Sequence, residues 1–289
     1  MSTINRRQFI KKGMLGIGSA ALLSQLPLNG FSGIPTSHPR HPVGFQVYTI
    51  REMLVKDFPG TLAMMAQMGY ETVEMCSPTG YITSGFHPLA KMKPEVMQKI
   101  FKANDLTCES SHFTFHELQN NPEERINYSN RLGLKQMIVS GFGLPEKATM
   151  NEWLNACDQL NEIGLKTVNS GLKLGYFNHH MEFEKIDGEL IYDALLKQLD
   201  PNLIKMQFQV AVINIGYKAS SYFLKYPGRF ISTHMADWSS AENKPIAIGK
   251  GDIDWREFYN AAEIGVVKNY YVEMDQDKFK DSVDFIHAM

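Results

Sequence analysis

The sequence has few of the residues that mark several common classes of protein. Only three cysteines occur among 289 residues, Cys76, Cys108 and Cys157, and no two of them form a Cys-x-x-Cys pair. This odd and widely spaced set argues against a disulfide framework and against a structural zinc site. We therefore expect three buried thiols that pack as small hydrophobic groups.

An excess of positive charge is also missing. The chain has 29 Lys and Arg against 31 Asp and Glu, which gives a formal net charge of -2. No basic run follows the first dozen residues, so we expect no nucleic-acid partner. No Gly-x-Gly-x-x-Gly fingerprint follows the first expected strand, which argues against a dinucleotide-binding sheet.

The N-terminus carries a pattern typical of export. Residues 5–12 read NRRQFIKK, a twin-arginine pattern, and the apolar stretch of residues 14–26 follows it. That stretch is shorter than the roughly 20 residues that a membrane-spanning helix needs, so we expect no membrane span. We predict a twin-arginine signal and linker over residues 1–32, cleaved between Ala21 and Gly33, and a periplasmic or otherwise exported protein. A basic N-terminal helix of the fold is the alternative.

From Val43 onward, short β-rich segments alternate with helical patterns. Strands are expected over residues 43–49, 70–76, 106–113, 136–140, 172–178, 204–213, 229–236 and 269–274. Helices are expected over residues 58–68, 94–103, 122–132, 151–169, 188–199, 220–225, 255–264 and 281–288. Alternating strands and helices imply parallel pairing, and eight right-handed crossovers close a barrel. We predict a single (β/α)8 TIM barrel over residues 33–289, with an open doubly wound sheet as the alternative.

In such a barrel the functional side chains stand at the carboxyl ends of the strands. Carboxylates and histidines follow five of the expected strands: Glu74; His112; His179, His180 and Glu182; His234 and Asp237; Glu273 and Asp275. Two carboxylates and one histidine suffice to bind Mn²⁺, Mg²⁺, Co²⁺ or Zn²⁺, which would polarise a carbonyl. Salt-bridged rim glutamates and plain loop histidines are the alternatives for these residues.

Five segments carry a family resemblance: residues 46–51 (QVYTIR), 68–74 (MGYETVE), 176–183 (YFNHHMEF), 225–229 with 234–237 (KYPGR…HMAD) and 271–276 (YVEMDQ). Together they resemble the sugar phosphate isomerase/epimerase family of the xylose isomerase-like TIM barrel superfamily, in particular a branch common among exported proteins. The first two segments are similar to that branch's first two strands. The other three resemble its YHNHDFEF, KYPGR…HVKD and FVEQDQ segments.

The resemblance implies a divalent metal held by Glu, Asp, His and Glu. Carried over by position, the metal ligands are Glu182, position 211, His234 and Glu273, and the two glutamates are also the catalytic acid/base pair. Position 211 departs from the family, because FQLDVYW reads FQVAVIN here and the aspartate is Ala211. The implied metal is therefore weakly bound or absent. The other rim side chains are the expected substrate contacts: Glu74, His112, Phe177, His179 and Asp237.

Phe177 is a second departure, since the family branch has histidine there. Ring stacking on a sugar and simple core packing are both compatible with it. Two functions stay open. The first is an isomerase, epimerase or keto-sugar lyase/hydratase that removes a proton next to a carbonyl of an unphosphorylated sugar or glycoside. The second is a catalytically degenerate barrel that binds a carbohydrate. A homodimer and an exported oxidoreductase partner are further expectations from the family.

Overall fold

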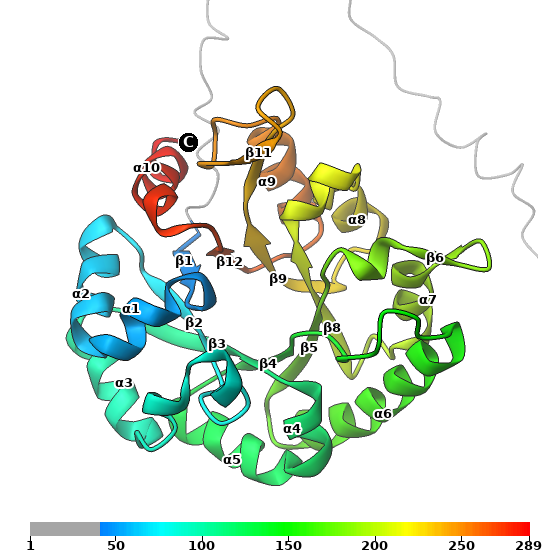
Figure 1. Cartoon of the computed structure of the whole chain (residues 1–289), viewed down its shortest axis with the longest axis horizontal. Coiled ribbons are helices and arrows are strands. Elements are labelled where there is room, and N and C mark those ends of the chain that lie inside the picture. The colour runs from blue at the N-terminus through cyan, green and yellow to red at the C-terminus, as the bar shows by residue number, and fades with distance from the viewer. Residues whose placement is uncertain (1–40) are drawn as a thin grey trace, which may run out of the picture. The chain divides into compact units, whose positions relative to one another are not determined.

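The computed structural model describes residues 41–289, so the predicted signal of residues 1–32 lies outside the described residues. Eight parallel strands close into a barrel in the order β1-β12-β9-β8-β5-β4-β3-β2, and helices surround it (Figure 1). The predicted (β/α)8 barrel is confirmed, and its compact unit begins at His41. Between residues 41 and 289, no helix has the length and apolar character needed to cross a bilayer.

The strands are shorter than the β-rich segments of the sequence. The barrel consists of β1 (Val43–Gln46), β2 (Thr72–Cys76), β3 (Thr107–Phe113), β4 (Gln136–Val139), β5 (Lys173–Phe177), β8 (Ile204–Gln209), β9 (Phe230–Met235) and β12 (Asn269–Val272). Two hairpins that the sequence analysis missed stand outside it, β6 (Lys185–Ile186) with β7 (Glu189–Leu190), and β10 (Asp237–Ser239) with β11 (Lys244–Ile246).

Helices connect successive barrel strands. They are α1 (Arg51–Lys56), α2 (Phe58–Met68), α3 (Pro94–Ala103), α4 (Phe115–Asn120), α5 (Pro122–Leu132), α6 (Met150–Asn169), α7 (Ile191–Gln198), α8 (Ala219–Lys225), α9 (Trp255–Ile264) and α10 (Phe279–Ala288). The predicted bounds of α2, α3, α5 and α9 are confirmed. The short helices α1 and α4 were not predicted, because a single helical turn or two carries little periodic signal.

Local chemistry explains where the helices begin and end. Pro94 and Pro122 occupy the first helical positions of α3 and α5, where a missing N–H costs nothing. Thr149 and Glu152 form a capping box at the start of α6. Gly69 and Gly133 follow α2 and α5 in the left-handed conformation, at φ values of 109° and 89°, which favours glycine.

The main core lies between the barrel and its helices, while the barrel interior is polar. The three cysteines are free and buried, as expected. Inside the barrel, the buried polar side chains include Glu74, Ser110, Gln136, Gln207 and Ser232. Gln136 donates to Ser110 at 2.9 Å, and Gln207 donates to Ser232 at 3.0 Å. Hydrogen bonds thus take the place of the branched apolar layers that usually fill a TIM barrel.

The predicted strand over residues 204–213 is wrong at its end. The strand β8 stops at Gln209, and a 3-10 helix, η6 (Val210–Ile215), follows it. The Gln209 side chain accepts a hydrogen bond from the backbone N–H of Ala211 at 3.1 Å, which stabilises the turn. Ala211 consequently lies beyond the sheet, where the alternation of a strand no longer decides which way its side chain points.

Gly44 lies where the barrel interior leaves no space for a side chain. A Cβ atom at Gly44 would lie 2.3 Å from Thr72 Oγ1 and 2.4 Å from the ring of the buried Tyr271. We expect Gly44→Ala to lower the free energy of unfolding by about 1–3 kcal/mol, because neither rigid neighbour can move away. Gly175→Ala is the matched control, since its added Cβ meets the terminal methyl of Ile138 at 2.6 Å. Urea denaturation that shows G175A to be the more destabilised variant would contradict the argument.

Candidate functional site

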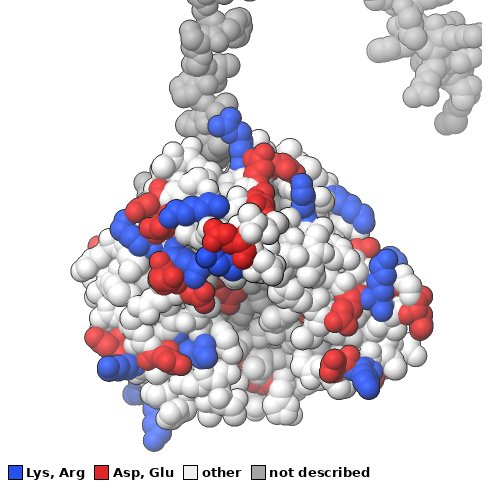
Figure 2. Space-filling view, turned by 45° about the horizontal axis from the view of Figure 1, so that its top comes forward, with Lys and Arg blue, Asp and Glu red and all other residues white. Residues whose placement is uncertain are grey.

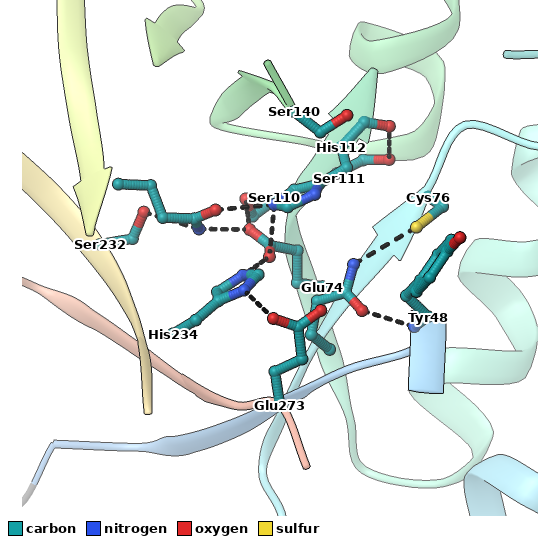
Figure 3. A network of polar contacts seen from close by, with 12 residues as sticks. Tyr48, Glu74, Cys76, Ser110, Ser111, His112, Ser140, Ser232, His234 and Glu273 are labelled. Carbon is teal, nitrogen blue, oxygen red and sulfur yellow. Dashed lines mark hydrogen bonds and ion pairs between the residues drawn. The ribbon is translucent and has the colours of Figure 1, made fainter. Parts of the chain in front are cut away.

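A buried carboxylate, Glu74 on β2, lies at the centre of a polar network inside the barrel (Figure 3). Its Oε1 accepts hydrogen bonds from Ser110 Oγ at 2.5 Å and from Gln207 Nε2 at 2.8 Å. Its Oε2 faces two imidazoles, with His112 Nε2 at 3.1 Å and His234 Nε2 in direct contact. Side chains from β2, β3, β8 and β9 therefore meet at one carboxylate.

His234 on β9 is held between two carboxylates. Its Nε2 contacts Glu74, and its Nδ1 lies 2.9 Å from Glu273 Oε2. Burial by itself lowers the pKa of His234, but Glu273 and Glu74 outweigh burial and raise its pKa to about 9. An imidazole with carboxylates at both nitrogens donates at both, so His234 carries a positive charge at neutral pH.

The two carboxylates are ionised for the same reason. Burial raises the pKa of Glu74, yet the charges and hydrogen bonds of His112 and His234 bring it well below its usual range. Burial also raises the pKa of Glu273, and His234 again reverses that effect and lowers it. The network therefore contains a buried cation between a fully buried anion, Glu74, and a partly buried one, Glu273.

Phe177 on β5 covers this network from one side. Its ring centroid lies 4.4 Å from that of His234 and 5.0 Å from that of His112. The two imidazoles are themselves stacked, 5.0 Å apart and tilted by 6°. With Ile138 and Ile231, Phe177 forms a small apolar cluster separate from the main core. The side chain that β5 contributes next to His234 is thus a phenyl ring.

The structure brings His234 and Glu273 together, but it does not bring Glu182 to them. Glu182 lies in the short 3-10 helix η5 (Met181–Phe183) after β5. Its Oε1 accepts from the Tyr176 hydroxyl at 2.7 Å, and its Oε2 accepts from the His179 backbone N–H at 2.8 Å. Tyr176 packs against Phe142, 4.6 Å between centroids, on the face of β5 opposite to Phe177.

The metal-ligand set implied by the family resemblance does not fit these residues. Position 211 offers a methyl group, and the carboxylate of Glu182 is occupied by Tyr176 and His179. Gln209 lies beside the gap and donates to Glu273 Oε2 at 2.7 Å, so it satisfies that carboxylate in place of an ion. A different set of ligand types does converge. Within residues 41–289, Glu74, His112 and His234 each place one possible metal-ligand atom within 4.8 Å of the other two.

Asp237 organises the loop that follows β9 and also lines the cavity at the barrel mouth. Its Oδ1 accepts from the backbone N–H of Trp238 at 2.9 Å, and its Oδ2 accepts from that of Gly249 at 2.9 Å. Trp255 Nε1 also donates to Oδ2, at 2.8 Å. Because its oxygens are held in this way, Asp237 holds the β10–β11 hairpin and the segment after it against the barrel mouth.

A cavity of about 270 Å³ opens beside Glu273 at the carboxyl end of the strands. The lining residues are Thr49, His180, Ala211, Asn214, Ala236, Asp237, Trp238, Pro245, Glu273, Met274 and Asp275. No lysine or arginine occurs among them. Glu273 is the only member of the ionic network that lines it, with 16% of its side chain exposed. Trp238, Asn214 and Thr49 were not predicted as site residues, because they lie on the hairpin strand β10 and in the 3-10 helices η6 and η2 (Tyr48–Ile50), which are too short to leave a periodic signal.

His179 lies near this network with an unused polar atom. Burial lowers its pKa, so the ring is neutral at neutral pH. Its Nδ1 is buried and has no hydrogen-bond partner among the described residues. A neutral imidazole nitrogen of this kind can accept from or donate to a hydroxyl group. On the face in Figure 2, which is hollowed at its centre, Lys and Arg lie interspersed with Asp and Glu.

Solved structures share this fold at low sequence identity. A sugar phosphate isomerase/epimerase from Parabacteroides distasonis superposes with a TM-score of 0.71 at 21% identity, over 86% of this chain and 95% of that chain. A D-psicose 3-epimerase reaches 0.59 at 12% identity, over 86% and 97%. A family 2 AP endonuclease from Brucella melitensis reaches 0.62 at 14%, over 86% and 99%.

These likenesses confirm the resemblance at the level of fold. The chain has the barrel of the sugar phosphate isomerases/epimerases and xylose isomerase-like proteins, aligned over most of its length. No family model matches the sequence, and no curated protein matches it. Because an endonuclease shares the same barrel, the chemistry has to be argued from the side chains of this chain.

The charge on His234 predicts a pH-dependent stability in chelator-treated protein. Its folded pKa of about 9 lies above the ordinary 6.5, so its contribution is complete below pH 6.5 and is lost as the pH rises through 9. We expect urea denaturation to show that the free energy of unfolding falls by about 2 kcal/mol over that pH range. The His234→Gln variant should not show this fall. If the free energy of unfolding depends on pH in the same way in the wild type and in His234→Gln, His234 is not charged.

Proposed function

We propose that the barrel mouth binds an unphosphorylated carbohydrate and that Glu273 removes a proton next to its carbonyl group. One observation carries the proposal: the only carboxylate of the ionic network that reaches the cavity is Glu273. A cavity of about 270 Å³ beside the carboxylate of Glu273 suits one sugar ring better than a macromolecule.

The lining of the cavity supports a neutral substrate. Trp238, half-buried on β10, presents an aromatic ring of the kind on which sugar rings stack, and Thr49, His180 and Asn214 offer hydrogen-bonding groups. A phosphate group would find three acidic residues there and no cation to pair with. The absence of a lysine or arginine from this lining therefore favours an unphosphorylated sugar or an oxidised glycoside.

The proton step uses the free oxygen of Glu273. His234 Nδ1 and Gln209 Nε2 both donate to Oε2, which leaves Oε1 for the substrate. The C–H bond next to the carbonyl breaks, its proton passes to Glu273, and its electron pair forms the C=C bond of an enediolate. The former carbonyl oxygen takes the negative charge. Because two donors hold Glu273 in place, little motion is needed before proton transfer.

The position of Glu182 favours one-base chemistry. Epimerisation with inversion needs a second acid on the opposite face of the sugar, a role that the family resemblance gives to Glu182. Its carboxylate is hydrogen-bonded to Tyr176 and to the His179 backbone instead. A single base that removes and returns a proton on one face supports aldose–ketose isomerisation or elimination. Since the family's metal-ligand set does not fit these residues, the proposed proton step depends on Glu273 and on its two donors, His234 and Gln209.

Ala211 and Phe177 favour the second candidate, a barrel that binds a sugar without converting it. Ala211 lines the cavity with a methyl group, and Phe177 packs over His234. Both changes remove polar groups that would otherwise stabilise a developing charge. Export by the twin-arginine pathway, a homodimer and an oxidoreductase partner remain predictions from the sequence and the family resemblance alone.

Proton exchange with solvent separates the two candidates. In D₂O, with a panel of unphosphorylated ketoses, aldoses and 3-keto-glycosides, we expect deuterium to enter the carbon next to the carbonyl. Glu273→Gln should slow this exchange by about 100-fold or more, because the base is lost. Asp275→Asn is the control, since Asp275 is an exposed carboxylate of the same lining that pairs with Lys278. If NMR shows saturable sugar binding but no exchange of the proton with solvent, the barrel binds a sugar without converting it.

Trp238 should contribute to sugar affinity in either case. We expect Trp238→Ala to weaken carbohydrate binding by about 10-fold, the effect of losing roughly 1.4 kcal/mol of stacking. The phosphorylated form of the best sugar should bind more weakly than the unphosphorylated form, because no cation lines the cavity. Isothermal titration calorimetry measures both; tighter binding of the phosphorylated sugar would contradict the proposed substrate class.

A further inference from the structure

We infer that Glu74, His112 and His234 form a binding site for a divalent transition-metal ion of the Zn²⁺ class, set deeper in the barrel than the family's metal site. The inference stands apart from the proposed sugar chemistry, because Glu74 and His112 do not line the cavity beside Glu273. It replaces the ligands that this chain lacks on β5 and β8 with ligands on β2 and β3.

The geometry of the three ligand atoms suits one small ion. Glu74 Oε2, His112 Nε2 and His234 Nε2 lie within 4.8 Å of one another, and the first two are 3.1 Å apart. An ion about 2.1 Å from each ligand needs ligand atoms roughly 3–3.5 Å apart, so only a small adjustment is required. Two imidazoles and one carboxylate are a donor set that Zn²⁺ and Co²⁺ prefer over Mg²⁺ or Ca²⁺.

The neighbouring side chains orient two of the three ligands for coordination. Ser110 and Gln207 both donate to Glu74 Oε1, so Oε2, which faces the two imidazoles, is the oxygen that an ion would share with them. Glu273 faces His234 Nδ1, so an ion at Nε2 would displace only the proton that this nitrogen holds against Glu74. His112 Nε2 would exchange its contact with Gln207 Oε1, at 2.7 Å, for the ion. Gln209 in turn fixes Glu273. A carboxylate behind a coordinating histidine is the usual outer shell of a zinc site.

Charge provides an independent reason. Glu74 and Glu273 bring two negative charges into the barrel, and His234 alone supplies at most one positive charge from its direct contacts with both. Buried charges are costly unless they are balanced, so a divalent cation would offset both carboxylates more completely than a proton does. Phe177 keeps water away from one side of the imidazoles, which strengthens the attraction.

Metal titration of the chelator-treated full chain tests the inference. We expect one Zn²⁺ or Co²⁺ per chain by calorimetry and elemental analysis, and for Co²⁺ a visible absorption band typical of nitrogen and oxygen ligands. His112→Asn and Glu74→Gln should each weaken the affinity by about 100-fold or more, because a direct ligand is lost. Glu182→Gln is the matched control, since its carboxylate bonds only to Tyr176 and the His179 backbone, and it should bind as the wild type does.

The outcomes separate this site from the family's site and from the proposed function. Loss of affinity in E182Q with retention in H112N would place the ion at the family's position and overturn the inference. A wild-type protein that binds no ion at millimolar Zn²⁺ would overturn it as well. If E74Q does not fold, the affinity of H112N and the shift of the imidazole NMR signals during metal titration still show whether the ion binds at this site. Failure of sugar binding or of proton exchange leaves these metal results unaffected, because they are measured without a sugar.

Discussion

The contact of His234 with Glu74 on one side and Glu273 on the other is the interaction on which the rest of the site depends. It joins β2, β9 and the residue that follows β12 through a charged group buried in the barrel. Removing one member of such a set leaves an uncompensated buried charge, which costs far more than the loss of a surface salt bridge. The same constraint explains the polar neighbours: Ser110 and Gln207 donate to the second oxygen of the buried Glu74, and Gln209 adds a second donor to Glu273 Oε2.

The contacts of His234 with Glu74 and Glu273 also determine the chemistry that the cavity can support. It keeps Glu273 ionised and presents one of its oxygens to a cavity that lacks cations. Ala211 and Phe177 place apolar groups on the β5 and β8 side of His234, whereas Glu74 and His112 lie on β2 and β3. The buried polar cluster therefore lies inside the barrel, and the cavity opens beside Glu273. Asp237 completes the arrangement, because it secures the hairpin that carries Trp238.

Much of the fold could be predicted from the sequence, because strand–helix alternation, proline at helix starts and glycine at helix ends are local signals. His234 and Glu273 were predicted to meet, and they do, since both follow strands that are neighbours in a barrel. Glu182 could not be placed in this way, because the turn after β5 lets its carboxylate bond to Tyr176. The end of β8 was missed for a similar reason: a glutamine side chain, not a change in periodicity, turns the chain there. Glu74 and His234 are 160 positions apart in the sequence, so no sequence spacing could predict that their side chains are in contact.

The fold alone does not select among sugar chemistry, nucleic-acid chemistry and binding, because barrels of similar shape serve both an epimerase and an endonuclease. In this chain the charges compensate one another inside the barrel, where His234 contacts Glu74 and Glu273. Phe177 covers this cluster, and Glu74 and His112 do not line the cavity. If the proposed ion binds to this cluster, it can influence the cavity only through Glu273, whose hydrogen bond to His234 links the interior to the mouth. On the proposed chemistry, the base strength of Glu273 therefore depends on the charge of His234, because a positive imidazole stabilises the ionised carboxylate that must accept the proton.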